Sequence, residues 1–169
     1  MRGNQTPRCN RGWGADTTLR TTVVQDDDML IEKVLYRAQV TATGGRDTRV
    51  LSSDGVLDLK LTTPRELGGA NGRGTNPEQL FAAGWSACFE GAIAVVAHKK
   101  KIKLLAEVAI DAEVDLHLDD GAYFLSARLN VSIPGIERSI AQGLVDDAKG
   151  TCPYSKATRG NIAVTYNVV

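Results

Sequence analysis

The sequence predicts an α+β fold in which antiparallel sheets pack on two helices, and three features of the chain predict it. The first is a long, almost wholly apolar helical stretch from Pro77 to about Ala97. The second is the alternation of apolar and polar residues before and after that stretch, which is typical of strands. The third is a shorter helical pattern ahead of the final strand. The predicted order of elements is βββ-α-ββ-α-β.

Three short strands are expected ahead of the long helix. Apolar residues alternate from Lys33 to Ala42, Gly44-Gly45 turn the chain, and Thr48–Ser52 forms a return strand. A further turn leads into a third strand at residues 57–61. Arg46 falls in the first turn, so we expect it at the rim of this sheet.

The long helix has a well-marked start. Asn76 can accept hydrogen bonds from free N–H groups, Pro77 suits the first helical position, and Glu78 places negative charge at the positive end of the helix dipole. From Leu80 to Ala97 only two residues are plainly polar, so this helix is expected to be buried on nearly every side. One small sheet cannot cover it, and a second copy of the chain is expected to do so.

A hairpin is expected after the long helix. Alternating apolar residues run over 108–118 and again over 123–133, and Asp120-Gly121 between them is a strong signal for a two-residue turn.

A short helix and a last strand complete the predicted fold. Helical spacing follows over 136–148, with Gly150 expected just past the helix end. Cys152-Pro153 is expected to begin a loop, and residues 162–168 to form the last strand.

Length and composition indicate one domain with a substantial core. The chain has 169 residues, of which 43% are hydrophobic, and its 20 basic residues balance 20 acidic ones without forming a basic stripe. Nucleic acid is therefore a poor candidate partner. Glu90 argues against a membrane span in the long helix, and the first residues contain no secretory signal, so a cytoplasmic protein is expected. Residues 1–28 are expected to be a disordered extension, with the domain spanning 29–169.

Three cysteines are too few and too irregular for a secreted disulfide framework. Cys9 lies in the N-terminal extension and is assigned no role. Cys88 lies within the long helix, where a lone cysteine is usually an inert small hydrophobe. Cys152 makes a second candidate, and a cysteine pair in a reducing compartment is more often catalytic or metal-binding than structural. His98 and His117 lack the spacing of a zinc site, so no metal is expected.

Four separate segments resemble one family. They are ATGGRD at Ala42–Asp47, SSDGVLDLKL at Ser52–Leu61, TNPEQLFAAGWSACF at Thr75–Phe89 and CPYSKATRGNI at Cys152–Ile162. The chain resembles the organic hydroperoxide resistance (Ohr) branch of the OsmC-like superfamily from about Met29 to its end. The resemblance implies an OsmC-like fold and an intertwined homodimer.

The resemblance also implies a thiol-dependent peroxidase. Cys88 would attack an organic, fatty-acid-type hydroperoxide and become a sulfenic acid, and Cys152 would resolve it as a Cys88–Cys152 disulfide. Arg46 would lower the thiol pKa, and Glu78 would orient Arg46 through a bidentate pair. The implied reductant is dihydrolipoamide or a lipoylated protein, and no bound cofactor is implied.

The spacing of these residues leaves the site's construction open. Glu78 and Cys88 are ten residues apart, on the order of 15 Å along a straight helix. Either the helix breaks near Gly84, or the Arg46 side chain reaches between them, or one partner comes from the other subunit.

Aromatic residues near the two cysteines could form an apolar mouth for an acyl chain. They are Phe81, Trp85, Phe89 and Tyr154. For Phe81 and Phe89, a place in the core is favoured.

Two other functions fit the same resemblance. One is a peroxidase of the OsmC-type sister branch, which differs in substrate and reductant. The other is a non-catalytic redox-sensing or ligand-binding module on the same fold. The family's Tyr in CPYSKAT favours the Ohr branch, and retention of Cys88, Cys152, Arg46 and Glu78 favours catalysis.

Overall fold

A computed structural model describes residues 33–70 and 72–169, so the expected N-terminal extension and Cys9 lie outside the described residues. The unit that begins at Ala38 holds all the regular elements. Along the chain these are β1 (Val40–Thr43), β2 (Arg49–Ser52), β3 (Asp58–Lys60), the 3₁₀ helix η1 (Arg65–Leu67), α1 (Pro77–Lys99), β4 (Ala109–Asp119), β5 (Ala122–Ser132), α2 (Arg138–Thr151), α3 (Pro153–Thr158) and β6 (Ala163–Val168).

The first sheet is the predicted three-stranded meander, with β2 between β1 and β3 and both pairings antiparallel. The expected strand over 33–42 is shorter than predicted, because β1 begins only at Val40. Its partner β2 ends at Ser52, opposite Val40, where the chain turns away. One further backbone hydrogen bond, from the Ser53 N–H to the Gln39 carbonyl at 3.0 Å, extends the pairing past Val40.

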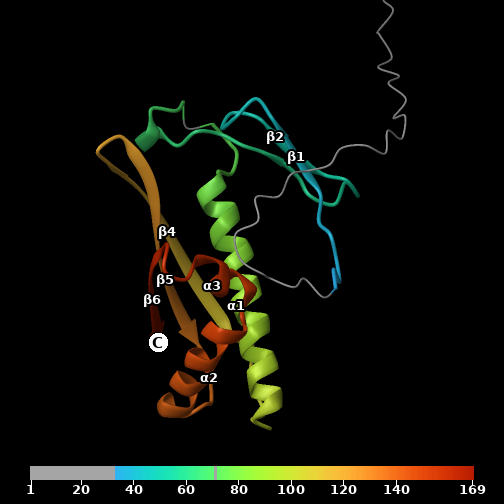
Figure 1. The fold of residues 1–169 in the computed structure, drawn as a ribbon, viewed down its shortest axis with the longest axis vertical. Helices are drawn as coiled ribbons and strands as arrows, with labels where there is room; N and C mark the ends of the chain where they lie inside the picture. The colour runs from blue at the N-terminus through green and yellow to red at the C-terminus, as the bar shows by residue number, and fades with distance from the viewer. Residues whose placement is uncertain (1–32, 71) are drawn as a thin grey trace, which may run out of the picture. The chain divides into compact units, whose positions relative to one another are not determined.

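Helix α1 begins as the sequence predicts. The Asn76 side chain accepts a hydrogen bond from the Gln79 N–H, Pro77 occupies the first turn and Glu78 follows it. The helix then runs unbroken to Lys99 (Figure 1). By length and composition alone α1 could cross a membrane, but part of its surface belongs to the protein core.

Within residues 33–70 and 72–169, one face of α1 is covered and the others are not. Its buried residues are Trp85, Phe89, Ala92, Ile93, Val96 and Ala97. Ala83, Ala87, Ala94 and Val95, on other sides of the helix, are exposed. The expectation of burial on nearly every side is therefore not met by one copy of the chain.

The second sheet is mixed, not wholly antiparallel as predicted. β4 and β5 form the expected hairpin, with Asp120 and Gly121 both at positive φ in the turn. β6 instead lies parallel to β5. For β6 to run parallel to β5, the chain must return to the end of the sheet at which β5 begins. Helices α2 and α3 form that crossover.

The segment between α2 and β6 also differs from the prediction. Gly150 does not end α2, since the helix continues to Thr151 and the Cys152 N–H still bonds to the Ala148 carbonyl. Cys152-Pro153 begins the short helix α3 instead of a loop. Pro153 occupies its first turn, where a missing N–H costs nothing, and Cys152 is its N-cap.

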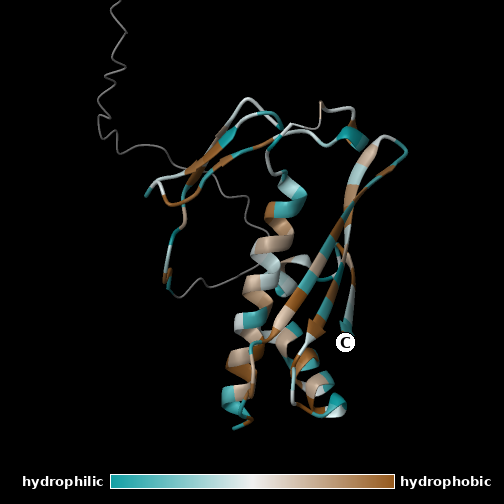
Figure 2. Ribbon diagram, turned by 180° about the vertical axis from the view of Figure 1, so that it is seen from behind, coloured by the Kyte–Doolittle hydropathy of each residue, from teal (hydrophilic) through white to brown (hydrophobic). Residues whose placement is uncertain are grey.

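The main core lies between one face of the second sheet and helices α1 and α2. Its fully buried members include Trp85, Phe89, Ile93, Leu129, Val131, Leu144 and Val145. Figure 2 shows the hydrophobic residues alternating with hydrophilic ones along β4 and β5, as a half-buried hairpin requires.

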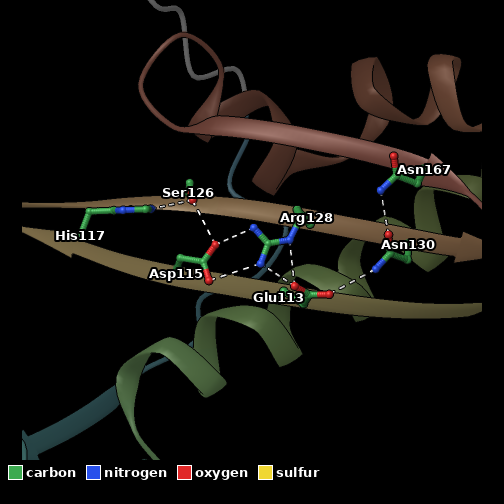
Figure 3. Close-up of polar contacts among 7 residues, drawn as sticks. All are labelled: Glu113, Asp115, His117, Ser126, Arg128, Asn130 and Asn167. Atoms are coloured by element: carbon green, nitrogen blue, oxygen red, sulfur yellow. Dashed lines mark hydrogen bonds and ion pairs between the residues drawn. The ribbon is translucent and has the colours of Figure 1, made fainter. Parts of the chain in front are cut away.

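The opposite face of the second sheet carries a polar network (Figure 3). The Arg128 guanidinium bridges Glu113 and Asp115 on the neighbouring strand, with its Nε 2.8 Å from Glu113 Oε2 and its Nη1 2.8 Å from Asp115 Oδ2. Ser126 connects Asp115 to His117. These charges satisfy one another across the strands, so this face is a solvated surface.

Candidate active site

The fold brings Cys88 and Cys152 into contact. Cys88 lies in the middle of α1 and Cys152 at the junction of α2 and α3, 64 residues further on, and their Sγ atoms are 3.3 Å apart. Both thiols are free. A disulfide places the sulfurs about 2.05 Å apart, so oxidation requires an approach of little more than about 1 Å.

The two thiols differ in access. Cys152 is fully buried, whereas Cys88 is partly exposed. The Cys152 sulfur accepts a hydrogen bond from the Ser155 N–H at 3.5 Å. A solute that reaches this pair therefore meets Cys88 first, which is the order expected of an attacking and a resolving cysteine.

Within one chain, the surroundings of Cys88 disfavour its thiolate. Burial raises the pKa of the Cys88 thiol, a hydrogen bond from the Tyr154 backbone N–H acts in the opposite direction, and the neighbouring Cys152 raises it further. No cationic side chain is among these causes. A nucleophilic thiolate at neutral pH thus needs a positive charge brought close to Cys88.

Arg46 and Glu78 form a forked pair. Arg46 Nη1 donates to Glu78 Oε2 at 3.0 Å, and Nη2 donates to Oε1 at 2.6 Å. The hydrogen bond from Arg46 holds the pKa of Glu78 below its ordinary value, against the opposing effect of burial. The guanidinium is therefore fixed and charged.

The turn that carries Arg46 is braced by its neighbour Asp47. The Asp47 carboxylate accepts hydrogen bonds from the Thr63 N–H at 2.8 Å and the Thr63 hydroxyl at 2.7 Å. Gly44 and Gly45 both adopt positive φ, which glycine tolerates best. The brace sets the position of the turn from which Arg46 extends towards the start of α1. No residue pattern in the sequence points to this contact of Asp47.

The structure thus forms two pairs, Arg46 with Glu78 and Cys88 with Cys152. The unbroken α1 excludes a helix break near Gly84 as the means of joining them. In the described part of the chain, every hydrogen bond of the Arg46 side chain goes to Glu78. The two pairs therefore stay apart, because Glu78 of one pair and Cys88 of the other lie ten residues apart on the unbroken helix α1.

The aromatic residues near the thiols divide between core and surface. Trp85 and Phe89 are fully buried and belong to the core, so they do not form an apolar mouth. Phe81 is partly buried and stacks on Tyr154 with ring centroids 6.2 Å apart. Tyr154 lies close over Gly84, where a Cβ would come within 3.1 Å of its hydroxyl. Of these four aromatic residues, Tyr154 and the partly buried Phe81, which also packs against the core as predicted, can contribute to an entrance near Cys88.

A cavity of about 610 Å³ adjoins Arg46. Four of its lining residues offer apolar surface, namely Leu67, Leu116, Leu118 and Tyr123. Its remaining lining residues are Arg46, Thr63, Glu66 and His117. Its wall therefore combines apolar surface with one cation and one carboxylate.

The histidines do not form a metal site. His98 is exposed at the end of α1, and His117 is part-buried, bonded to Ser126 and stacked on Phe124. In residues 33–70 and 72–169 no three His, Cys, Asp or Glu side chains are grouped so that they could hold a metal ion.

Comparison with known proteins agrees with this fold. A family model described as OsmC-like protein matches residues 69–167. An organic hydroperoxide resistance protein of Xanthomonas axonopodis pv. citri is 57% identical over 134 residues, covering 79% of this chain and 94% of that protein. OhrB of Bacillus subtilis is 46% identical over 132 residues, covering 77% and 95%.

Solved structures are similar as well. An organic hydroperoxide resistance protein from Legionella pneumophila gives a TM-score of 0.76 at 46% identity, covering 80% of this chain and 98% of that chain. A Vibrio cholerae protein described as a putative organic hydroperoxide resistance protein gives 0.76 at 40% identity, covering 82% and 94%, and has captopril bound in one of its active sites.

Fold and thiol pair together define an OsmC-like α+β protein with a two-cysteine centre. Within that class, the chain belongs to the organic hydroperoxide resistance (Ohr) proteins of the OsmC-like family.

The Arg46–Glu78 pair predicts a defined pH dependence of stability. Because the pKa of Glu78 is lowered in the folded protein, the pair stabilises the fold above the pKa of an unfolded glutamate, and this contribution is lost as the pH falls through the lowered folded value. Arg46→Gln should therefore destabilise the protein at neutral pH and have little effect once Glu78 is protonated. Urea unfolding at both pH values measures this.

A control comes from the same sheet, where Arg49 makes a forked pair with Asp58. In a carboxyl-carbon NMR titration, Arg46→Gln should raise the pKa of Glu78 and leave Asp58 unchanged, and Arg49→Gln should do the reverse. A Glu78 titration identical in wild type and Arg46→Gln would contradict the pairing.

Proposed function

We propose that the protein is a thiol-dependent peroxidase that reduces organic, fatty-acid-type hydroperoxides to alcohols. The observation that carries this proposal is the 3.3 Å contact between the partly exposed Cys88 and the buried Cys152. The protein's place among the organic hydroperoxide resistance proteins supports it. Its four proposed site residues are Cys88, Cys152, Arg46 and Glu78.

The reaction proceeds in two steps. The Cys88 thiolate attacks one peroxide oxygen, the O–O bond breaks, and the products are a Cys88 sulfenic acid and the alcohol. The Cys152 thiol then attacks the sulfenic sulfur, forming the Cys88–Cys152 disulfide and releasing water. The sulfur contact already present shortens the path of the second step.

The first step needs a cation, and Arg46 of a second copy is the proposed source. Within one chain, the pKa of Cys88 is raised and the Arg46 guanidinium is bonded at the start of α1, away from the thiols. A helix-to-helix dimer can place the start of one α1 beside the middle of the other. The site would then combine the Arg46–Glu78 pair of one subunit with the cysteines of its partner.

Uncovered apolar surface supports an intertwined homodimer. The small β1–β3 sheet exposes Val40, Leu51 and Leu59, and Val56 in its second turn is also exposed. The uncovered sides of α1 are rich in alanine and also carry the exposed Val95. A sheet this small does not bury enough surface to be stable by itself, whereas a large interface buries both regions.

The cavity beside Arg46 is the proposed acyl-chain site. Its leucines and Tyr123 provide apolar contacts, and the adjacent guanidinium would stabilise the departing alkoxide. An organic hydroperoxide gains from the apolar wall, whereas hydrogen peroxide does not. This accounts for a preference for bulky hydroperoxides.

The proposed reductant is a dithiol, either dihydrolipoamide or a lipoylated protein. Since Cys88 is the accessible sulfur, the incoming thiolate attacks it first and releases Cys152. The second thiol of the reductant then displaces Cys88 and leaves as a cyclic disulfide. The family resemblance supports the choice of a lipoyl dithiol over a monothiol.

The test of the proposed cycle is intact mass after one equivalent of cumene hydroperoxide, in protein carrying Cys9→Ser. A loss of two hydrogens is expected, mapped to a Cys88–Cys152 peptide and reversed by dihydrolipoamide. Cys88→Ser should show no mass change. Cys152→Ser should stop at the sulfenic acid and gain further oxygens with more peroxide. An unchanged wild-type mass would instead indicate a non-catalytic module.

Mixed dimers test whether the site spans two subunits. Arg46→Gln and Cys88→Ser are each expected to be inactive alone. Random mixing should restore about a quarter of wild-type activity, because half of the dimers are mixed and each has one complete site. Mixing Cys88→Ser with Cys152→Ser is the control and should restore none, since both cysteines come from one chain. No recovery in the first mixture would contradict a shared site.

A further inference from the structure

Ser155 is a buried connection between three elements, α1, α3 and β6, of which α1 carries Cys88 and α3 has Cys152 as its N-cap. It lies in α3 and is only 4% exposed. Its hydroxyl oxygen accepts a hydrogen bond from Trp85 Nε1 of α1 at 3.1 Å and another from the Tyr166 hydroxyl of β6 at 3.0 Å. A serine oxygen has two lone pairs, so these donors use its full accepting capacity.

The same residue contacts the resolving cysteine through its backbone. The Ser155 N–H donates to the Cys152 sulfur at 3.5 Å. Trp85 lies one helical turn before Cys88 on α1 and is fully buried. Ser155 therefore connects the helix that carries Cys88 to the turn that carries Cys152.

We propose that Ser155 is a positioning residue for disulfide formation, which holds Cys152 within reach of oxidised Cys88. This inference rests on the proposed peroxidase cycle. Ser155 does not touch the peroxide and takes no part in its cleavage. Its hydroxyl fixes α3 against α1 and β6, and its N–H fixes the Cys152 sulfur on the side facing Cys88.

The chemical consequence follows from two competing fates of the sulfenic acid. Attack by the Cys152 thiol forms the disulfide and water. Attack by the sulfenic sulfur on a second hydroperoxide forms a sulfinic acid and a second alcohol, and this product is not reduced by dithiols. The ratio of disulfide to sulfinic acid at a fixed peroxide concentration therefore reports how well Cys152 is positioned.

Ser155→Ala removes the shared acceptor and leaves the buried Trp85 N–H and the part-buried Tyr166 hydroxyl without their partner. With excess cumene hydroperoxide, the sulfinic acid formed per turnover should rise by at least about five-fold, because two hydrogen bonds are lost and the loss of one changes a rate ratio by about that factor. The rate of the first alcohol release should stay within about two-fold of wild type, because Cys88 keeps its own surroundings. Mass spectrometry of Cys88 measures the partition, and single-turnover alcohol release measures the first step.

Two further variants separate positioning from general loss of stability. Tyr166→Phe removes one donor, preserves the ring and leaves Ser155 intact, so it should shift the partition in the same direction by a smaller factor. Thr158→Val is the matched control, since the Thr158 hydroxyl donates to the Tyr154 and Ser155 carbonyls of its own helix and, among the described residues, has no hydrogen bond to α1 or β6. Its partition should equal that of wild type even if its thermal midpoint falls.

The outcomes are distinguishable from failure of the cycle itself. Wild type that forms disulfide, with a raised sulfinic fraction in Tyr166→Phe and, if it folds, in Ser155→Ala, supports the proposal. A wild-type partition in Tyr166→Phe, or an equal shift in Thr158→Val, overturns it while leaving the peroxidase cycle in place. Wild type that forms no disulfide overturns the proposed function first.

Discussion

The contact between the Cys88 and Cys152 sulfurs depends on how α1 packs against the α2–α3 junction. A cysteine in a buried helix has no reactivity of its own, and Cys152 is wholly enclosed. Trp85 and Phe89 anchor α1 in the core on either side of Cys88, and Pro153 starts a new helix immediately after Cys152. The core thus keeps two thiols 3.3 Å apart although 64 residues separate them.

The charged half of the proposed site follows a different constraint. A straight helix cannot bring Glu78 and Cys88 together, and the Arg46 guanidinium makes a forked pair with Glu78. At the same time burial raises the pKa of Cys88. The proposed dimer meets both constraints, because a second subunit would bring its own Arg46–Glu78 pair to the thiols. The uncovered sides of α1 and the exposed β1–β3 sheet are the surfaces available for that assembly.

Local sequence signals predicted much of this fold. Features that depend on contacts between distant parts of the chain were not predicted. Asn76, Pro77 and the Asp120-Gly121 turn act through neighbouring backbone groups, so their residue types suffice. The direction of β6 depends on where α2 and α3 return the chain to the sheet. The residues of β6 themselves do not indicate whether the strand is parallel or antiparallel to β5. The Cys88–Cys152 contact came from family resemblance and not from spacing. The sequence gives no sign of the proposed positioning role of Ser155. Its hydroxyl bonds to Trp85, which is 70 residues away, and to Tyr166, which lies in a different element.

The most direct test of the account is the pH dependence of Cys88 alkylation in assembled protein carrying Cys9→Ser and Cys152→Ser. We expect the pH of half-maximal reactivity to lie below that of an ordinary thiol when Arg46 is present. It should move above the ordinary value in Arg46→Gln, where burial raises the pKa of Cys88 by more than the hydrogen bond from the Tyr154 N–H lowers it. Identical profiles with and without Arg46 would contradict the account, because the guanidinium would then play no part in ionising Cys88.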